Sequence, residues 1–190
     1  SSGKGQYRRT RCWRLLRDFN LIVSTSRFRE EEAQDEILDL LDLFGDQEAV
    51  AEITEVKGLI VAETSLDPLA VIAGLKKLVA EEPWRVRYVL RVIPIEVVVP
   101  ADLDDIEEAA KELAEGKIRK EEDSFRITVE KRHSTLESMD VIKAIAGEID
   151  SKVDLENPTW IVLVEIVAGH AGVSVLRPDQ IFSAVVEKRR

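Results

Sequence analysis

The order of apolar patterns between residues 20 and 95 constrains the fold more than any other feature of this sequence. Short apolar runs typical of strands lie at 20–25, 50–56, 59–63 and, interrupted by Pro94, at 85–99. Helical spacing is found over 29–44, before Gly45, and over 69–82, where Asp67 and Pro68 supply a cap and a first turn. The predicted order is strand, helix, strand, strand, helix, strand.

This order is the split βαβ arrangement of a ferredoxin-like sandwich, in which two helices cover one face of an antiparallel sheet. We therefore predict a ferredoxin-like domain over residues 20–96. The fold serves many unrelated functions and fixes none of them. An acylphosphatase-type enzyme shares the topology, but the loop 24–28 lacks the glycine-rich phosphate cradle that such chemistry needs.

A second series of elements begins at Pro100. An acidic helix is expected over 102–115, and the strand 125–132 alternates apolar and polar side chains. A capping box at 134–137 predicts a helix that runs to Ile149. The apolar run 160–167 is typical of a strand covered on both faces, followed by a turn, a strand over 173–176 and a short helix after Pro178. We predict a second α/β domain over residues 97–190.

The charge is unevenly distributed, which matters because nucleic acid responds to local patches. The formal net charge is −10, but residues 1–29 carry +7, residues 30–99 carry −10 and residues 100–190 carry −7. We interpret residues 1–19 as a basic leader, disordered or left over from a tag; the alternative is an arm that contacts phosphate. An acidic body can bind RNA only where its basic residues gather in space.

Residues of the kinds that carry catalysis are scarce. Cys12 is the only cysteine, which excludes an internal disulfide and favours a cytoplasmic protein. With only His133 and His170, a metal site is not expected. The sequence has no nucleotide-binding or nucleophile motif, and its longest apolar run, 158–169, is too short for a membrane span. We expect no enzyme, no cofactor and no membrane partner.

Basic residues are the more informative positive signal. Strand alternation would place Arg85, Arg87 and Arg91 on one face of the segment that begins at residue 85. Further basic residues precede or end the strand 125–132: Lys117, Arg119, Lys120, Lys131 and Arg132. Guanidinium groups suit phosphate oxygens, and the alternative for each residue is an ion pair with one of the many carboxylates.

Four motifs of the second half belong together: FRITVEKRHS at 125–134, MDVI at 139–142, KVDLENP at 152–158 and IVLVEI at 161–166. With these motifs the second half resembles the THUMP domain of RNA-modifying proteins. The resemblance covers roughly residues 97–185. A ferredoxin-like domain ahead of THUMP is the usual arrangement in that family. Together with RYVLRVIPI at 87–95, the chain is most similar to the stand-alone THUMP subfamily that serves as a tRNA-binding adaptor.

The resemblance implies tRNA recognition through the acceptor end and presentation of the tRNA to a separate enzyme, the RNA cytidine acetyltransferase that forms N4-acetylcytidine. It adds Arg126 and Lys152 to the phosphate-contact candidates and gives Asp154, Asn157 and Pro158 a structural role. DNA is not an expected partner. One alternative is the recognition subunit of a split tRNA thiolation or methylation enzyme, and another is a protein-interaction module that never touches RNA.

Overall fold

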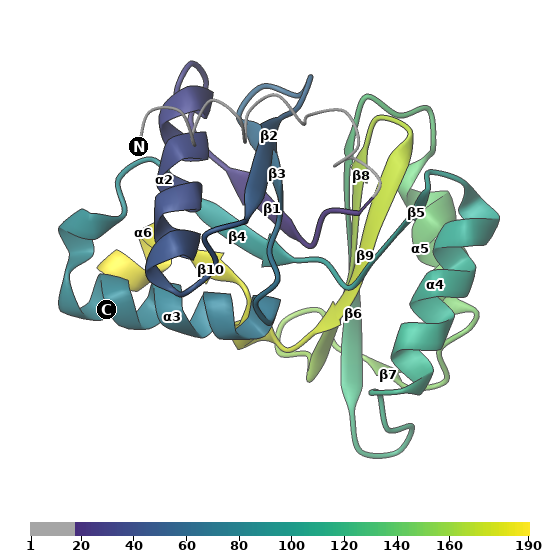
Figure 1. Cartoon of the computed structure of the whole chain (residues 1–190). Helices are drawn as coiled ribbons and strands as arrows, with labels where there is room; N and C mark the ends of the chain where they lie inside the picture. The colour runs from purple at the N-terminus through teal and green to yellow at the C-terminus, as the bar shows by residue number, and fades with distance from the viewer. Residues whose placement is uncertain (1–17) are drawn as a thin grey trace. The chain divides into compact units, whose positions relative to one another are not determined.

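The computed structural model describes residues 18–190. The chain forms two compact units (Figure 1). The first unit ends at Pro94 and includes the chain again from Gln180 to Arg190, whereas the second comprises Ile95–Asp179. No helix of the described residues is long and apolar enough to cross a membrane.

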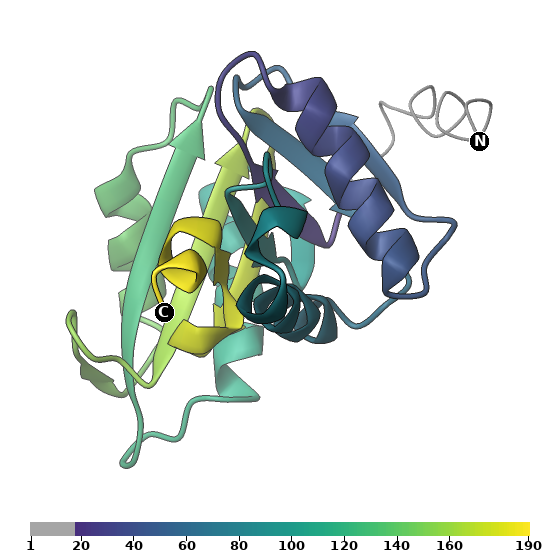
Figure 2. The same cartoon turned by 90° about the vertical axis from the view of Figure 1, so that its left-hand side faces the viewer.

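The first unit is the predicted ferredoxin-like sandwich. Its elements follow the order β1 (Leu21–Ser24), α2 (Glu30–Leu43), β2 (Val50–Ile53), β3 (Leu59–Glu63), α3 (Pro68–Glu81), the 3-10 helix η2 (Pro83–Arg85) and β4 (Arg91–Pro94). These strands pair antiparallel in the order β4-β1-β3-β2. The helix α2 packs against β2 and β3, and Figure 2 shows it lying along the sheet.

Apolar side chains at alternate strand positions and at helical spacing form the core of this unit. Leu21 and Val23 of β1 contact a buried apolar cluster to which α2 contributes Ile37 and Leu41 and α3 contributes Leu75. The Asp67 carboxylate accepts a hydrogen bond from the Leu69 N–H at 3.0 Å, so α3 begins with the cap that the sequence predicted.

The second unit is an α/β domain with a mixed sheet. It contains β5 (Val97–Pro100), α4 (Leu103–Glu115), β6 (Ser124–Arg132), α5 (Ser138–Ala146), β7 (Lys152–Val153), β8 (Trp160–Val167) and β9 (His170–Leu176), followed by the 3-10 helix η3 (Pro178–Gln180). The strand order is β5-β9-β8-β6-β7, with β6 parallel to both β7 and β8. The helices α4 and α5 pack against each other, α4 also against β9 and α5 against β6.

The C-terminal residues differ from the prediction, which placed all of 97–190 in the second domain. The strand β10 (Phe182–Ser183) pairs with β4, and the helix α6 (Ala184–Lys188) contacts α3. The Phe182 side chain is 0% exposed within the core of the first unit. A two-residue strand is too short to show alternation, so the sequence pattern gives no sign of this return.

Two local predictions are also corrected. Residues 85–90 are not part of a strand, because Glu36 on α2 accepts hydrogen bonds from the Arg87, Tyr88 and Val89 N–H groups and holds them as a loop. The helix expected from the capping box begins only at Ser138 and ends at Ala146. The Ser134 hydroxyl instead accepts from the Leu136 N–H at 3.2 Å, which forms a local turn.

Glu52 on the edge strand β2 links stability to pH. Its Oε2 is buried and accepts no hydrogen bond from residues 18–190, and burial raises the pKa of Glu52 to about 7. From pH 4.5 to 7 the unfolded chain gives up this proton while the folded protein keeps it, so stability falls as pH rises. We expect Glu52→Gln to stabilise the protein at pH 8 by about 1 kcal/mol, since a half-buried carboxylate stays partly hydrated.

Urea unfolding of the wild type and of Glu52→Gln at pH 8 and pH 4 checks this prediction. The difference between their free energies of unfolding should vanish at pH 4, where Glu52 is protonated in the folded and in the unfolded protein. Glu63→Gln is the matched control, because Glu63 is exposed at the end of the neighbouring strand β3. A gain of equal size at both pH values would show that the ionisation of Glu52 is not its cause.

Candidate nucleic-acid interface

The end of β6 carries two of the predicted basic residues in different environments. Arg132 Nη1 lies 2.5 Å from Oε2 of Glu165 on β8, and the Glu165 side chain is only 1% exposed. Lys131 is exposed, and its Nζ donates to the Leu136 carbonyl at 2.9 Å. Arg132 therefore neutralises a buried carboxylate, whereas Lys131 remains on the surface.

The segment 152–158 forms a compact turn beside the start of β6. Asp154 Oδ1 accepts from the Glu156 and Asn157 N–H groups at 3.1 and 3.0 Å, and these bonds lower the pKa of Asp154. Arg126 Nη1 donates to the Leu155 carbonyl at 3.0 Å, and Pro158 is buried. Asp154 and Pro158 thus lie where a turn-shaping role requires them.

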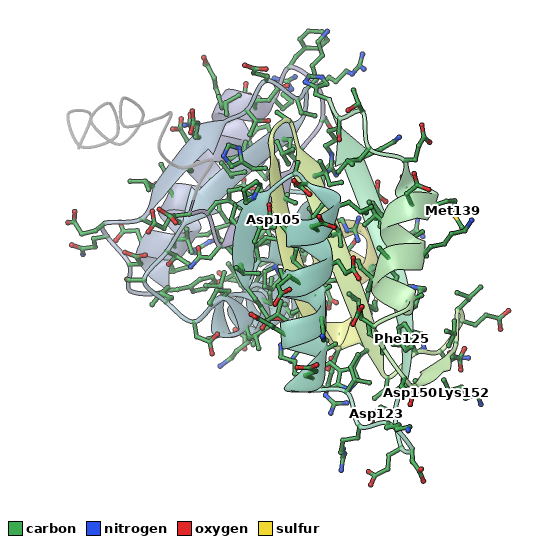
Figure 3. All side chains as sticks on the ribbon, turned by 90° about the vertical axis from the view of Figure 1, so that its right-hand side faces the viewer. Asp105, Asp123, Phe125, Met139, Asp150 and Lys152 are labelled. Carbon is green, nitrogen blue, oxygen red and sulfur yellow. The ribbon has the colours of Figure 1, made fainter. Side chains whose placement is uncertain are left out.

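This turn presents a cation together with apolar side chains. Lys152 is exposed, and so are Val153 and Leu155, the latter to 67%. Figure 3 shows Lys152 and Asp150 at the same end of the unit as Asp123, near the start of β6. An exposed lysine at this position is available to a phosphate oxygen.

The basic residues between α4 and β6 are paired with carboxylates. Lys117 Nζ donates to Glu96 Oε1 and to the Val175 carbonyl, each at 2.7 Å. Arg119 pairs with Glu122 at 2.8 Å, and Lys120 pairs with Asp150 at 2.7 Å, which raises the pKa of Lys120. The exposed pairs of Arg119 and Lys120 cost little to break, so both side chains remain available to phosphate.

Sequence reasoning missed a further cluster, centred on Trp160. The Arg177 guanidinium lies 4.4 Å from the centroid of the Trp160 ring, and the indole Nε1 donates to Asp123 Oδ2 at 3.0 Å. A signal was present in the sequence. Ile161 pairs with Leu176 in the β8–β9 hairpin, so Trp160, the first residue of β8, lies beside Arg177, which follows β9. The cluster adds an exposed arginine near Lys117.

The arginines of the first unit do not share one strand face, which corrects that prediction. Arg85 lies on η2 with its Nη1 3.9 Å from Glu82, Arg87 lies in the loop with its guanidinium 5.4 Å from the Tyr88 ring centroid, and only Arg91 lies on β4. The prediction failed because Glu36 draws the backbone of 87–89 out of strand geometry.

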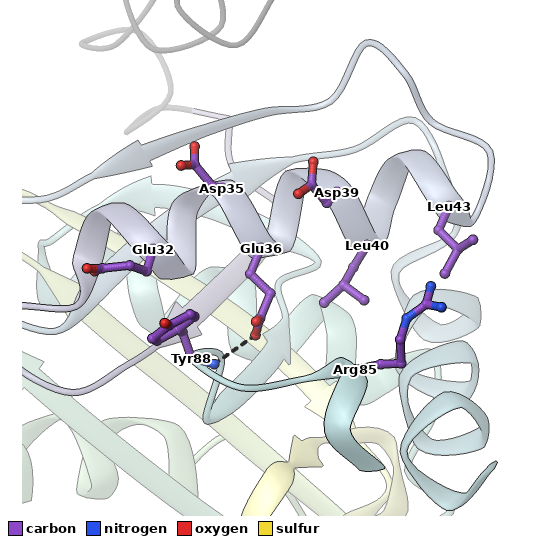
Figure 4. Close-up of a pocket in the computed structure, with 8 residues that line it drawn as sticks. All are labelled: Glu32, Asp35, Glu36, Asp39, Leu40, Leu43, Arg85 and Tyr88. Atoms are coloured by element: carbon purple, nitrogen blue, oxygen red, sulfur yellow. Dashed lines mark hydrogen bonds between the residues drawn. The ribbon is translucent and has the colours of Figure 1, made fainter. Parts of the chain in front are cut away.

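A groove of about 430 Å³ in this unit is unsuited to phosphate. Figure 4 shows its acidic lining, in which Arg85 is the cation. The carboxylates all come from α2: Glu32, Asp35, Glu36 and Asp39. Their repulsion directs any RNA to other surfaces of the unit. The described residues also contain no group of three or more His, Cys, Asp or Glu that could hold a metal ion.

Residues 100–176 match the family model of the THUMP domain. A curated relative, the THUMP domain-containing protein 1 homolog of Drosophila melanogaster, is 35% identical in an alignment of 96 positions that covers 47% of this chain and 30% of the relative. The chain therefore spans about a third of that relative's length.

Two solved structures share the fold over most of the chain. TrmN from Thermus thermophilus superposes with a TM-score of 0.55 at 18% identity, covering 84% of this chain and 46% of TrmN. A 4-thiouridine synthetase in complex with RNA and ATP gives a TM-score of 0.50 at 12% identity, covering 84% of this chain and 42% of the synthetase. At these low identities the superpositions show a shared fold and nothing more.

Proposed function

Because residues 100–176 form a THUMP domain, we propose that this protein binds tRNA and presents it to a separate modifying enzyme. The observation that carries the proposal is the pairing of this domain with a ferredoxin-like unit, a fold shared over 84% of the chain with a 4-thiouridine synthetase bound to RNA. For the second unit of this protein we propose three exposed basic residues as phosphate contacts: Lys131, Lys152 and Arg177.

The catalytic partner that we propose is the tRNA cytidine N4-acetyltransferase. This follows the sequence resemblance to stand-alone THUMP adaptors, carried by residues 87–95 and 125–166. A recognition subunit for tRNA thiolation or methylation is the alternative, and the fold likenesses to the 4-thiouridine synthetase and to TrmN are compatible with either form. Mapping the modified nucleoside that disappears from tRNA when the gene is deleted separates these functions.

We also propose that the chain catalyses no step itself, since its sequence lacks nucleotide-binding and nucleophile motifs. Purified protein incubated with unmodified tRNA and acetyl-CoA, adenosylmethionine or a sulfur donor should leave every nucleoside unchanged by mass spectrometry. Stoichiometric product formed without a second protein would disprove the adaptor role.

Lys152 gives the most direct test of tRNA binding. If it contacts one phosphate, Lys152→Ala should reduce the slope of log affinity against log salt concentration by about 1 and weaken binding similarly for all tRNA species. Fluorescence anisotropy with an in vitro transcript at several salt concentrations measures both quantities.

The matched control is Lys77→Ala, which removes an exposed lysine from α3 in the first unit. It should leave the slope unchanged. If the two variants behave alike, Lys152 is not a phosphate contact. If the wild-type chain binds no tRNA even at low salt, the protein-interaction alternative replaces the adaptor.

A further inference from the structure

The loop between β1 and α2 presents an aromatic side chain to solvent. Phe28 is 84% exposed, the largest value among the exposed large hydrophobic side chains of the described residues. Arginines precede and follow it, Arg27 and Arg29. Burying such a ring would stabilise the fold, so its exposure contributes nothing to the core.

The backbone of Phe28 is also strained. Its φ is +70°, in the left-handed region that glycine and asparagine tolerate and that is a genuine outlier for a bulky residue. Non-glycine residues in this region persist only where the surroundings hold them, and they cluster at functional sites. Phe28 therefore opposes stability twice, through its backbone and through its exposed ring.

The surrounding loop is fixed by contacts that do not involve the ring. The Thr25 N–H donates to the Gly58 carbonyl at 2.9 Å, the Thr25 hydroxyl donates to the Tyr88 carbonyl at 2.8 Å, and the Glu30 carboxylate accepts from the Gly58 N–H at 3.0 Å. A Cβ at Gly58 would lie 2.6 Å from the Thr25 carbonyl oxygen, so only glycine allows this approach. The loop holds its shape without the phenyl group.

We propose that Phe28 is a stacking platform for an unpaired base of RNA. This inference deepens the proposed function, since it assigns a single-stranded part of the bound RNA to the first unit. Every base has a π face, and stacking on an aromatic ring is tolerant of sequence. Two exposed cations can reach the backbone of that nucleotide. Arg27 precedes Phe28 in the chain, and Lys57 precedes Gly58, whose carbonyl accepts from the Thr25 N–H.

The charge around the loop favours stacking over phosphate attraction as the source of affinity. Arg29 Nη1 lies 3.4 Å from Glu32, and the first turn of α2 contains Glu30, Glu31 and Glu32. Acidic residues this close offset the neighbouring arginines. Removing the ring should therefore weaken binding without changing its salt dependence, unlike removal of Lys152.

Phe28→Gly and Phe28→Asn test the proposal, because both residues suit a positive φ and neither has an aromatic ring. Each variant should unfold at a higher temperature than the wild type, yet bind a short single-stranded oligoribonucleotide and intact tRNA about tenfold more weakly, with an unchanged salt slope. Phe28→Trp should retain binding. Trp84→Gly, at another exposed aromatic residue of the same unit, should leave affinity unchanged.

The outcomes separate this proposal from the proposed function. Unaltered RNA affinity in Phe28→Gly and Phe28→Asn would overturn the stacking role, and so would a loss of stability in both variants, which would make the ring structural. Wild-type protein that binds the oligoribonucleotide through Phe28 but not tRNA would support stacking and refute the tRNA adaptor. Wild-type protein that binds neither RNA would refute both.

Discussion

Replacing Arg132 by alanine should lower the free energy of unfolding by about 3 kcal/mol, a large part of the stability of a domain this size. The expected loss arises from Glu165, which is 1% exposed and would be left as a buried charge without its guanidinium partner. Urea denaturation followed by circular dichroism measures the change. A change in tRNA binding is assigned to the Arg132 side chain itself only where circular dichroism shows that the variant is folded.

The double variant Arg132→Met with Glu165→Leu is the internal test of this explanation. It removes both charges and should recover most of the lost stability, since a buried ion pair is often replaceable by apolar residues of similar volume. Lys131→Ala, one residue earlier on β6, should change stability little, because the Lys131 Nζ makes an exposed hydrogen bond to the Leu136 carbonyl. If Arg132→Ala is as stable as the wild type, Glu165 is compensated by other groups.

Separating the two units should weaken tRNA binding by on the order of 10²-fold or more relative to the intact chain. The second unit has exposed cations but a net negative charge, and the first has Arg91 and the Phe28 loop, so neither supplies enough contacts alone. Contacts on one RNA sum while the cost of association is met once. Anisotropy with the fragment 95–179 and the intact chain measures the difference.

The fragment must show folded secondary structure by circular dichroism before its affinity is compared. A transcript trimmed of its single-stranded 3′ end should lose much of the gain that the intact chain provides. Full affinity in residues 95–179 alone would show that the first unit does not contact RNA. Equal binding of trimmed tRNA would remove the acceptor end from the interaction.

The sequence predicts those parts of the fold that depend on local pattern. Three features appear where expected: the strand β6, whose apolar side chains pack on the core of the second unit, the buried strand β8, and the Asp67 cap of α3. The prediction of a strand over residues 85–90 failed, because Glu36, about fifty positions earlier, accepts hydrogen bonds from three backbone N–H groups of this segment. Such a contact overrides local propensity and is invisible to a periodicity argument.

The site was less predictable, because pairing between charges depends on register. Arg132 and Glu165 meet since the parallel β6–β8 register places Glu165 opposite Glu130, two residues from Arg132 on the same face. A glutamate within the run 160–167 was nevertheless a signal, since a buried carboxylate requires a partner. Phe28 offered no such signal, because its exposure and positive φ emerge only from the folded loop.

The return of the chain to β4 makes the second unit an insertion within the first. During synthesis the N-terminal sheet remains without its edge strand until residues 180–190 emerge, after the whole second unit has been made. A nascent or truncated chain without Phe182 lacks part of the first core and leaves the β4 edge open to pairing with other strands. A chain truncated before residue 180 should therefore present this edge to proteases, whereas a chain that includes residues 180–190 covers it.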